Sequence, residues 1–117
     1  MTRSIMLVVS FALAAVAQAH TPLKSSAPAA DASVNAPTAI ELAFSGDVRL
    51  TSVALTDAGG AAKHLDAVPT AIASTFSLAV HEPLTPGAYK VVWRAVGGDT
   101  HIISGEFAFT VVAAHAH

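Results

Sequence analysis

The stretch "YKVVWRAVGGDTHIISGEFAFTVV", residues 89–112, carries the strongest structural signal in the chain. Two runs in it alternate between apolar and polar residues, and a segment with two glycines separates them. Side chains of a β-strand point alternately to opposite faces, so each run predicts a strand with one face in the core. The residues on these core-facing sides are Tyr89, Val91, Trp93, Phe107, Phe109 and Val111.

Similar alternation occurs in "TAIELAFS" (38–45), "TSVALTD" (51–57) and "STFSLAV" (74–80). The turn signals "DAGG" (57–60) and Pro-Gly (86–87) lie between such runs. Several short strands with regular turn signals predict an all-β fold, an antiparallel sandwich or barrel.

Three glycines have expected structural roles near the last two runs. Gly97 and Gly98 would let the chain turn sharply before Asp99, and Gly105 would mark a β-bulge. Trp93 is expected to pack in the core. Residues 21–37, with three prolines, are expected to form an edge strand or ordered arm followed by a loop.

The first 19 residues have the features of a secretory signal peptide. Arg3 precedes the apolar run "IMLVVSFALAAVA", and "AQA" at 17–19 is a small-x-small cleavage signature. The run is shorter than the roughly 20 residues that span a bilayer, which disfavours an uncleaved anchor. We therefore expect an exported protein with cleavage after Ala19, one domain over residues 20–112 and a tail at 113–117.

Composition narrows the range of functions. The chain has no cysteine, and its two methionines, Met1 and Met6, leave with the signal peptide, so the mature protein has no sulfur ligand. The net charge is −2 and no basic run occurs, which argues against nucleic acid as a partner.

Cleavage after Ala19 would leave His20 as the first residue. Its α-amine and Nδ1 could then hold one metal ion in a small chelate ring, and both lose their protons near neutral pH. Asp99 and His101 lie two apart in an extended segment and therefore point to the same side. Three nitrogens and a carboxylate oxygen suit Cu(II), although Zn(II) also accepts such ligands.

The chain resembles the CopC family of bacterial periplasmic copper-binding proteins. The resemblance rests on "HTPLKSSAPAADASV" (20–34), "IELAFSGDV" (40–48), "LTPGAYKVVWRAV" (84–96) and "GDTHIISGEFAFTV" (98–111). It implies a periplasmic location, an antiparallel Greek-key barrel of about seven strands that is immunoglobulin-like or cupredoxin-like, and a Cu(II) site formed by His20, Asp99 and His101. It also implies a copper carrier in tolerance or uptake, often with an inner-membrane partner of the CopD type.

The chain departs from the family pattern in three places. Thr100 stands where the D-G-H stretch of the family usually has glycine. No methionine-rich loop for Cu(I) is present, so Cu(II) binding alone is expected. Gly46 stands where an acidic residue often follows "FS", which leaves open whether its neighbour Asp47 supports the site.

The other histidines are expected to lie outside this site. His64 and His81 are interpreted as solvated surface residues, and His115 and His117 as part of the tail. A non-enzymatic copper carrier or buffer is the favoured function. Two alternatives are a small copper monooxygenase that uses the N-terminal histidine chelate and a metal-free structural β-domain. An aspartate ligand would occupy a position that oxygen chemistry needs open, which argues against the enzyme.

Overall fold

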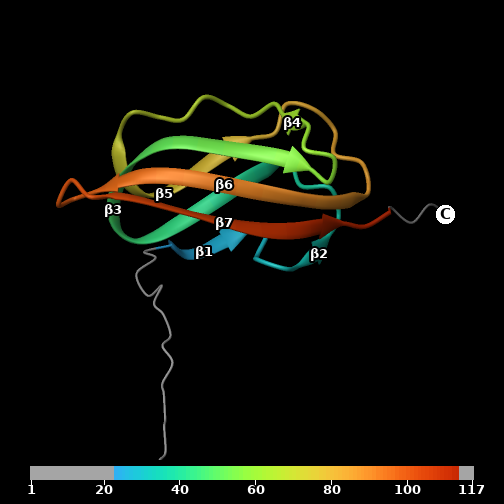
Figure 1. The fold of residues 1–117 in the computed structure, drawn as a ribbon, viewed down its shortest axis with the longest axis horizontal. Helices are drawn as coiled ribbons and strands as arrows, with labels where there is room; N and C mark the ends of the chain where they lie inside the picture. Colours follow the sequence, from blue (N-terminus) through green and yellow to red (C-terminus); the bar gives the residue numbers. More distant parts are fainter. Residues whose placement is uncertain (1–22, 114–117) are drawn as a thin grey trace, which may run out of the picture.

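A computed structural model describes residues 23–113 of the 117-residue chain (Figure 1). Within that range the protein is all-β, and no helix is present that could cross a membrane. The seven strands are β1 (Leu23–Ala27), β2 (Ser33–Val34), β3 (Ala39–Asp57), β4 (Ala62–Lys63), β5 (Ile72–Ala79), β6 (Gly87–Gly97) and β7 (Ile102–Val111). The predicted all-β class with about seven strands is confirmed.

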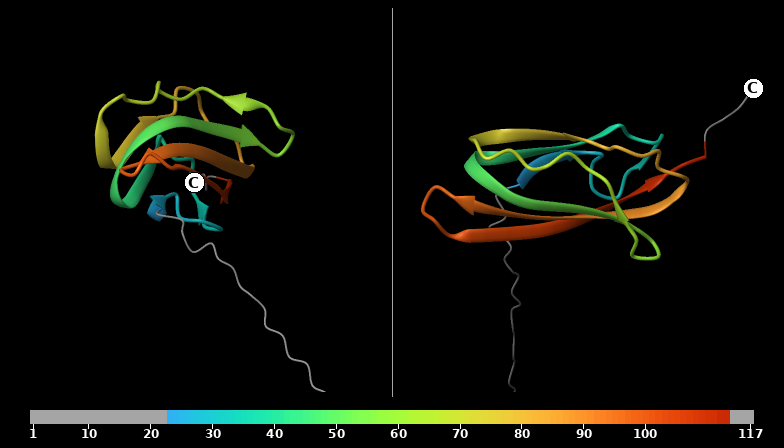
Figure 2. Two further views of the ribbon diagram at one scale, coloured as in Figure 1. Left: turned by 60° about the vertical axis from the view of Figure 1, so that its left-hand side comes forward. Right: turned by 90° about the horizontal axis from the view of Figure 1, so that it is seen from above.

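The strands form one sheet that curls around the core (Figures 1 and 2). Its order is β1-β3-β6-β7-β2, and β4 and β5 also pair with β3. Every pair is antiparallel except the short β2, which runs parallel to the end of β7. The predicted β1 edge strand is also present, because residues 23–27 pair only with β3.

Strand β3 differs from the expectation of two separate strands at 38–45 and 51–57. It is continuous over 19 residues. Its first part pairs with β1 on one side and β5 on the other, and its second part pairs with β6. The pairing register shifts after Ala43 and after Leu50, and such irregularities bend a strand. The chain therefore moves from one half of the barrel to the other without a loop.

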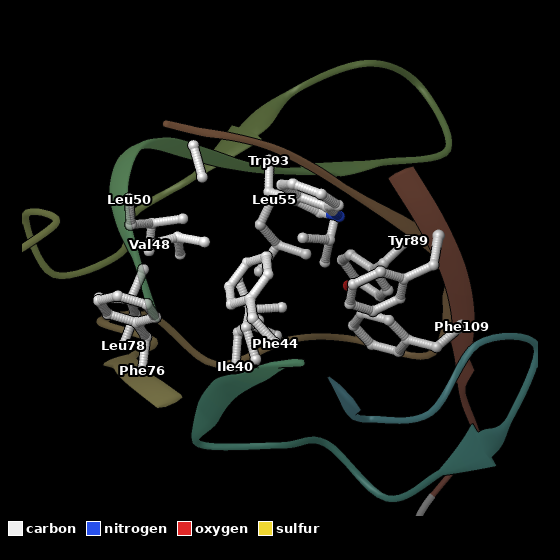
Figure 3. Close-up of a cluster of buried hydrophobic side chains, with 14 of the residues drawn as sticks. Ile40, Phe44, Val48, Leu50, Leu55, Phe76, Leu78, Tyr89, Trp93 and Phe109 are labelled. Atoms are coloured by element: carbon white, nitrogen blue, oxygen red, sulfur yellow. The ribbon is translucent and has the colours of Figure 1, made fainter. Parts of the chain in front are cut away.

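The inward faces of the long strands form a single apolar core (Figure 3). No polar or charged residue among those described is buried. Trp93 is 1% exposed and meets Phe44 edge to face, with ring centroids 5.2 Å apart, so its predicted packing role is confirmed. The core residues are Ile40, Leu42, Phe44, Val48, Leu50, Leu55, Phe76, Leu78, Leu84, Tyr89, Val91, Trp93, Ala95, Phe107, Phe109 and Val111.

The expectation of a β-bulge at Gly105 is wrong. The β6–β7 pairing runs without interruption from Gly87 opposite Val111 to Val96 opposite Ile102. Gly105 lies opposite Trp93, and a Cβ atom at Gly105 would lie only 2.7 Å from Cζ2 of the indole. The glycine is therefore needed for close packing of the tryptophan and not for a change of register.

Candidate metal centre

The loop between β6 and β7 carries the predicted ligands Asp99 and His101, and it projects from the left-hand end of the barrel in Figure 1. Two backbone hydrogen bonds close it. The Gly97 N–H donates to the His101 carbonyl at 2.9 Å, and the Thr100 N–H donates to the Gly97 carbonyl at 2.9 Å. The loop is thus a tight extension of the β6–β7 hairpin that presents both side chains at one end of the sheet.

The residue that makes this turn sharp is not one of the two glycines. Neither Gly97 nor Gly98 has a positive φ, whereas Thr100 has φ +66°. The expectation that the glycines supply the turn is corrected accordingly. The left-handed conformation costs an L-residue roughly 1–2 kcal/mol, more for a β-branched side chain, and glycine escapes this cost.

Asp99 and His101 form a close pair in this loop. Nδ1 of His101 lies 2.7 Å from Oδ2 of Asp99, and the His101 backbone N–H donates to Oδ1 at 3.1 Å. Both side chains are open to solvent, with exposed fractions of 79% for His101 and 68% for Asp99. The carboxylate therefore orients the imidazole, while the ring stays accessible from outside.

The electrostatics of the pair favour the charged form of both groups. The hydrogen bond from the His101 ring, followed by the one from its backbone, lowers the pKa of Asp99. The hydrogen bond to Asp99 and the charge of that carboxylate raise the pKa of His101. Nδ1 of His101 is bonded to Asp99 in this geometry, so a metal ion held by both side chains would replace the hydrogen bond between them.

A shallow hollow lies beside the pair. It is lined by residues 45–48 of β3 and by residues 97–99 and 101–103 of the hairpin, which include Asp99 and His101. Asp47, whose role the sequence left open, lines the same hollow. Asp47 therefore shares a hollow with the pair, although it is one position further along β3 than Gly46, where the sequence comparison expected an acidic residue.

The third predicted ligand, His20, lies outside the described residues. The described chain begins at Leu23, which is opposite Phe44, immediately before the β3 residues that line the hollow. Between residues 23 and 113 no group of three or more histidine, aspartate or glutamate side chains is placed to hold a metal ion. The described part of the chain thus supplies two of the three predicted ligand residues.

The remaining histidines fall in two groups. His115 and His117 lie outside the described residues. His64 and His81 are exposed, as expected, but Nε2 of His81 lies 2.5 Å from Oδ1 of Asp66. No sequence signal indicates this second pair, because 15 residues separate its members. This pair lies at the opposite end of β5 from the hairpin loop. Ile72, at the start of β5, pairs with Arg49, which also pairs with Val96 near the loop. His81 comes two residues after Ala79, at the other end of β5.

Among solved structures, the fold is similar to copper-resistance β-barrels. PcoC, described as a methionine-rich copper resistance protein from Escherichia coli, superposes with a TM-score of 0.66 at 39% identity, covering 79% of this chain and 98% of that one. CopC from Methylosinus trichosporium OB3b superposes with a TM-score of 0.70 at 25% identity, covering 84% of this chain and 99% of that one. The fold is thus shared with small β-barrels, among them one described as a copper resistance protein.

Sequence comparison gives the family. The CopC domain model matches residues 23–112. Copper resistance protein C from E. coli is 41% identical over 81% of this chain and 83% of that protein. The protein of the same name from Pseudomonas syringae pv. tomato is 38% identical over 85% and 86%. The chain belongs to the CopC family, which confirms the resemblance drawn from its motifs.

Proposed function

We propose that the protein is a periplasmic Cu(II)-binding protein that carries or buffers copper in homeostasis, resistance or uptake. The observation that carries this proposal is the exposed Asp99–His101 pair on the β6–β7 loop. The proposed ligands of the Cu(II) ion are the α-amine and Nδ1 of His20, the Asp99 carboxylate and His101. Residues 1–19 are removed by cleavage in this proposal. The relatives named copper resistance protein C support copper as the cargo.

The donor set suits Cu(II) better than Cu(I). Nitrogen and oxygen donors are typical of tetragonal Cu(II) sites, whereas thioethers select Cu(I). The PcoC structure is described as methionine-rich, but this chain has methionine only at positions 1 and 6, within the predicted signal peptide. We therefore propose Cu(II) as the only oxidation state that the mature protein binds tightly.

The position of β1 supports the participation of His20. Leu23 starts beside the hollow, and decreasing residue numbers along β1 run in the direction of residues 45–48 of β3. Three further residues span at most about 10 Å in an extended chain. We therefore propose that this short segment brings the amine and imidazole of His20 to Asp99 and His101.

Exposure of the pair favours a carrier over an enzyme. A cargo ion must be released to another protein, and a ligand pair at the tip of a hairpin can be approached without opening the barrel. A copper monooxygenase would need an open coordination position, which the proposed Asp99 ligand would occupy. A CopD-type inner-membrane protein is the proposed partner for the exchange.

Cu(II) titration of the mature protein that starts at His20 tests this function. We expect the first equivalent of Cu(II) to give a single tetragonal electron paramagnetic resonance signal, in a variant in which His115→Ala and His117→Ala remove the tail histidines. Oxygen consumption with ascorbate should not exceed that of free copper. Absence of a defined signal at one equivalent would contradict the carrier, and faster oxygen consumption would favour the enzyme.

A further inference from the structure

We propose that His64 and His81 form a second binding site, for one divalent cation of the Zn(II) or Cu(II) type. His64 lies directly after β4, at the start of the loop that leads to β5, and His81 lies just after the end of β5. Their ring centroids are 5.9 Å apart. A metal ion bound tetrahedrally by one nitrogen of each ring would hold the two centroids about 5 Å apart, because metal–nitrogen bonds measure roughly 2.0–2.1 Å. The two exposed rings therefore need to approach by less than about 1 Å to share one ion.

The backbone holds the two histidines side by side. The His81 N–H donates to the His64 carbonyl at 2.8 Å, and the Asp66 N–H donates to the Ala79 carbonyl at 3.0 Å. Leu65 and Val80 form a β-bridge between these two bonds. Main-chain pairing thus fixes the backbone positions of both histidines, so the backbone part of the ordering cost is already met by the fold.

Asp66 prepares His81 for this role. Its Oδ1 lies 2.5 Å from Nε2 of His81, and its Oδ2 accepts the Ala79 N–H at 3.0 Å. A carboxylate that accepts the N–H of one ring nitrogen selects the tautomer in which the other nitrogen has its lone pair free. Nδ1 of His81 is then the ligand atom, and Asp66 is a positioning residue.

Glu82 completes the surroundings. Its Oε2 accepts the His64 backbone N–H at 2.7 Å, which ties the two segments together a second time. Both histidines, Asp66 and Glu82 line one shallow surface depression. Because no three donor side chains converge on a common point in residues 23–113, the site would have two protein nitrogens and solvent as its remaining ligands.

The chemistry of this site differs from that of the hairpin site. Two imidazoles with nearby carboxylates suit Zn(II), Cu(II) and other borderline divalent cations, and no sulfur donor selects Cu(I). The two sites lie at opposite ends of β5, whose eight residues correspond to roughly 25 Å. An ion at one site is therefore too far away to share ligands with an ion at the other.

The test is a Zn(II) titration of the mature chain followed by nuclear magnetic resonance of the histidine ring signals. The tail histidines are changed to alanine in every sample. We expect the rings of His64 and His81 to shift along one common binding curve. In His81→Ala the affinity reported by His64 should fall about tenfold or more, whereas in the matched control His101→Ala it should change less than about twofold.

Asp66→Asn separates a positioning role from a merely structural one. It should lower the affinity at His64 and His81 by about 10–100-fold while the near-ultraviolet signal of the buried Trp93 stays unchanged. The proposal is overturned if the two rings titrate with unrelated curves, or if His81→Ala leaves the Zn(II) affinity at His64 unaltered. Loss of the hairpin site alone, in His101→Ala, would affect only the proposed carrier function.

Discussion

Two acid–histidine pairs occupy opposite ends of the barrel, and they are built differently. Asp99 and His101 lie two residues apart in one hairpin loop, so one short segment determines their geometry. Asp66 and His81 come from segments 15 residues apart and meet through backbone pairing around Leu65 and Val80. The comparison shows that similar side-chain chemistry can arise from a local turn or from tertiary pairing.

The largest expected effect is a loss of Cu(II) affinity that occurs when the first pair is changed but not when the second pair is changed. His101→Ala should lower Cu(II) affinity at the first equivalent by more than about 100-fold, because a ligand is lost rather than a supporting contact. His81→Ala should change that first affinity less than about twofold. Competition against a chelator of known affinity measures both. Equal losses in the two variants would show that the pairs are not independent.

A second prediction concerns the sheet that lies between the pairs. Gly105→Ala places a Cβ atom against the Trp93 ring, which has no space for it. Overpacking of this kind should lower the free energy of unfolding by about 1–3 kcal/mol. Both pairs should remain intact in the native state. Urea unfolding measures the loss, and an unchanged midpoint would refute the packing role of Gly105.

A smaller effect is expected at the turn that shapes the first pair. Thr100→Gly removes a β-branched residue from φ +66° and should raise stability by about 1 kcal/mol. The gain is limited because glycine also increases the conformational freedom of the unfolded chain. The same urea assay applies, with Thr110→Gly, an exposed position in β7, as the destabilising control. A loss of stability in Thr100→Gly would contradict the strain.

The smallest effect is the pH dependence of the metal-free hairpin pair. The pKa of His101 is raised in the folded protein. Its contribution to folding stability is therefore fully present below the ordinary imidazole pKa of about 6.5 and is lost as pH rises through the raised pKa. Asp99 has a lowered pKa, so its contribution is present above about 3.9 and is lost as pH falls through the lowered value. Asp99→Asn should return the His101 titration to its ordinary range, as measured by resonance of the ring; an unchanged midpoint would contradict the pairing.

Local patterns predicted most of the fold. The alternation of apolar and polar residues identified the strands, because buried residues such as Tyr89, Val91 and Trp93 occur at every second position. The continuity of β3 was not predictable, since its bends depend on pairing with β1, β5 and β6. The role of Gly105 was mistaken for a similar reason: the clash that excludes a side chain appears only when the register places Trp93 opposite it.

The same distinction applies to the candidate sites. The sequence predicted that Asp99 and His101 would share one side, but on the basis of an extended segment. The structure places both in the turn between β6 and β7, where Thr100 has φ +66°. This turn conformation and the shared hollow with Asp47 required the structure, because neither follows from a two-residue spacing. Asp66 and His81 required it entirely, since nothing in a 15-residue separation indicates a contact.

The most direct test of the account is Cu(II) affinity in two forms of the mature protein, one starting at His20 and one with a single alanine placed before it. The added residue converts the α-amine of His20 into a peptide group and leaves Asp99 and His101 unchanged. We predict a loss of affinity of more than about 100-fold, greater than the loss of a supporting contact would cause. Equal affinity in the two forms would contradict the N-terminal copper chelate.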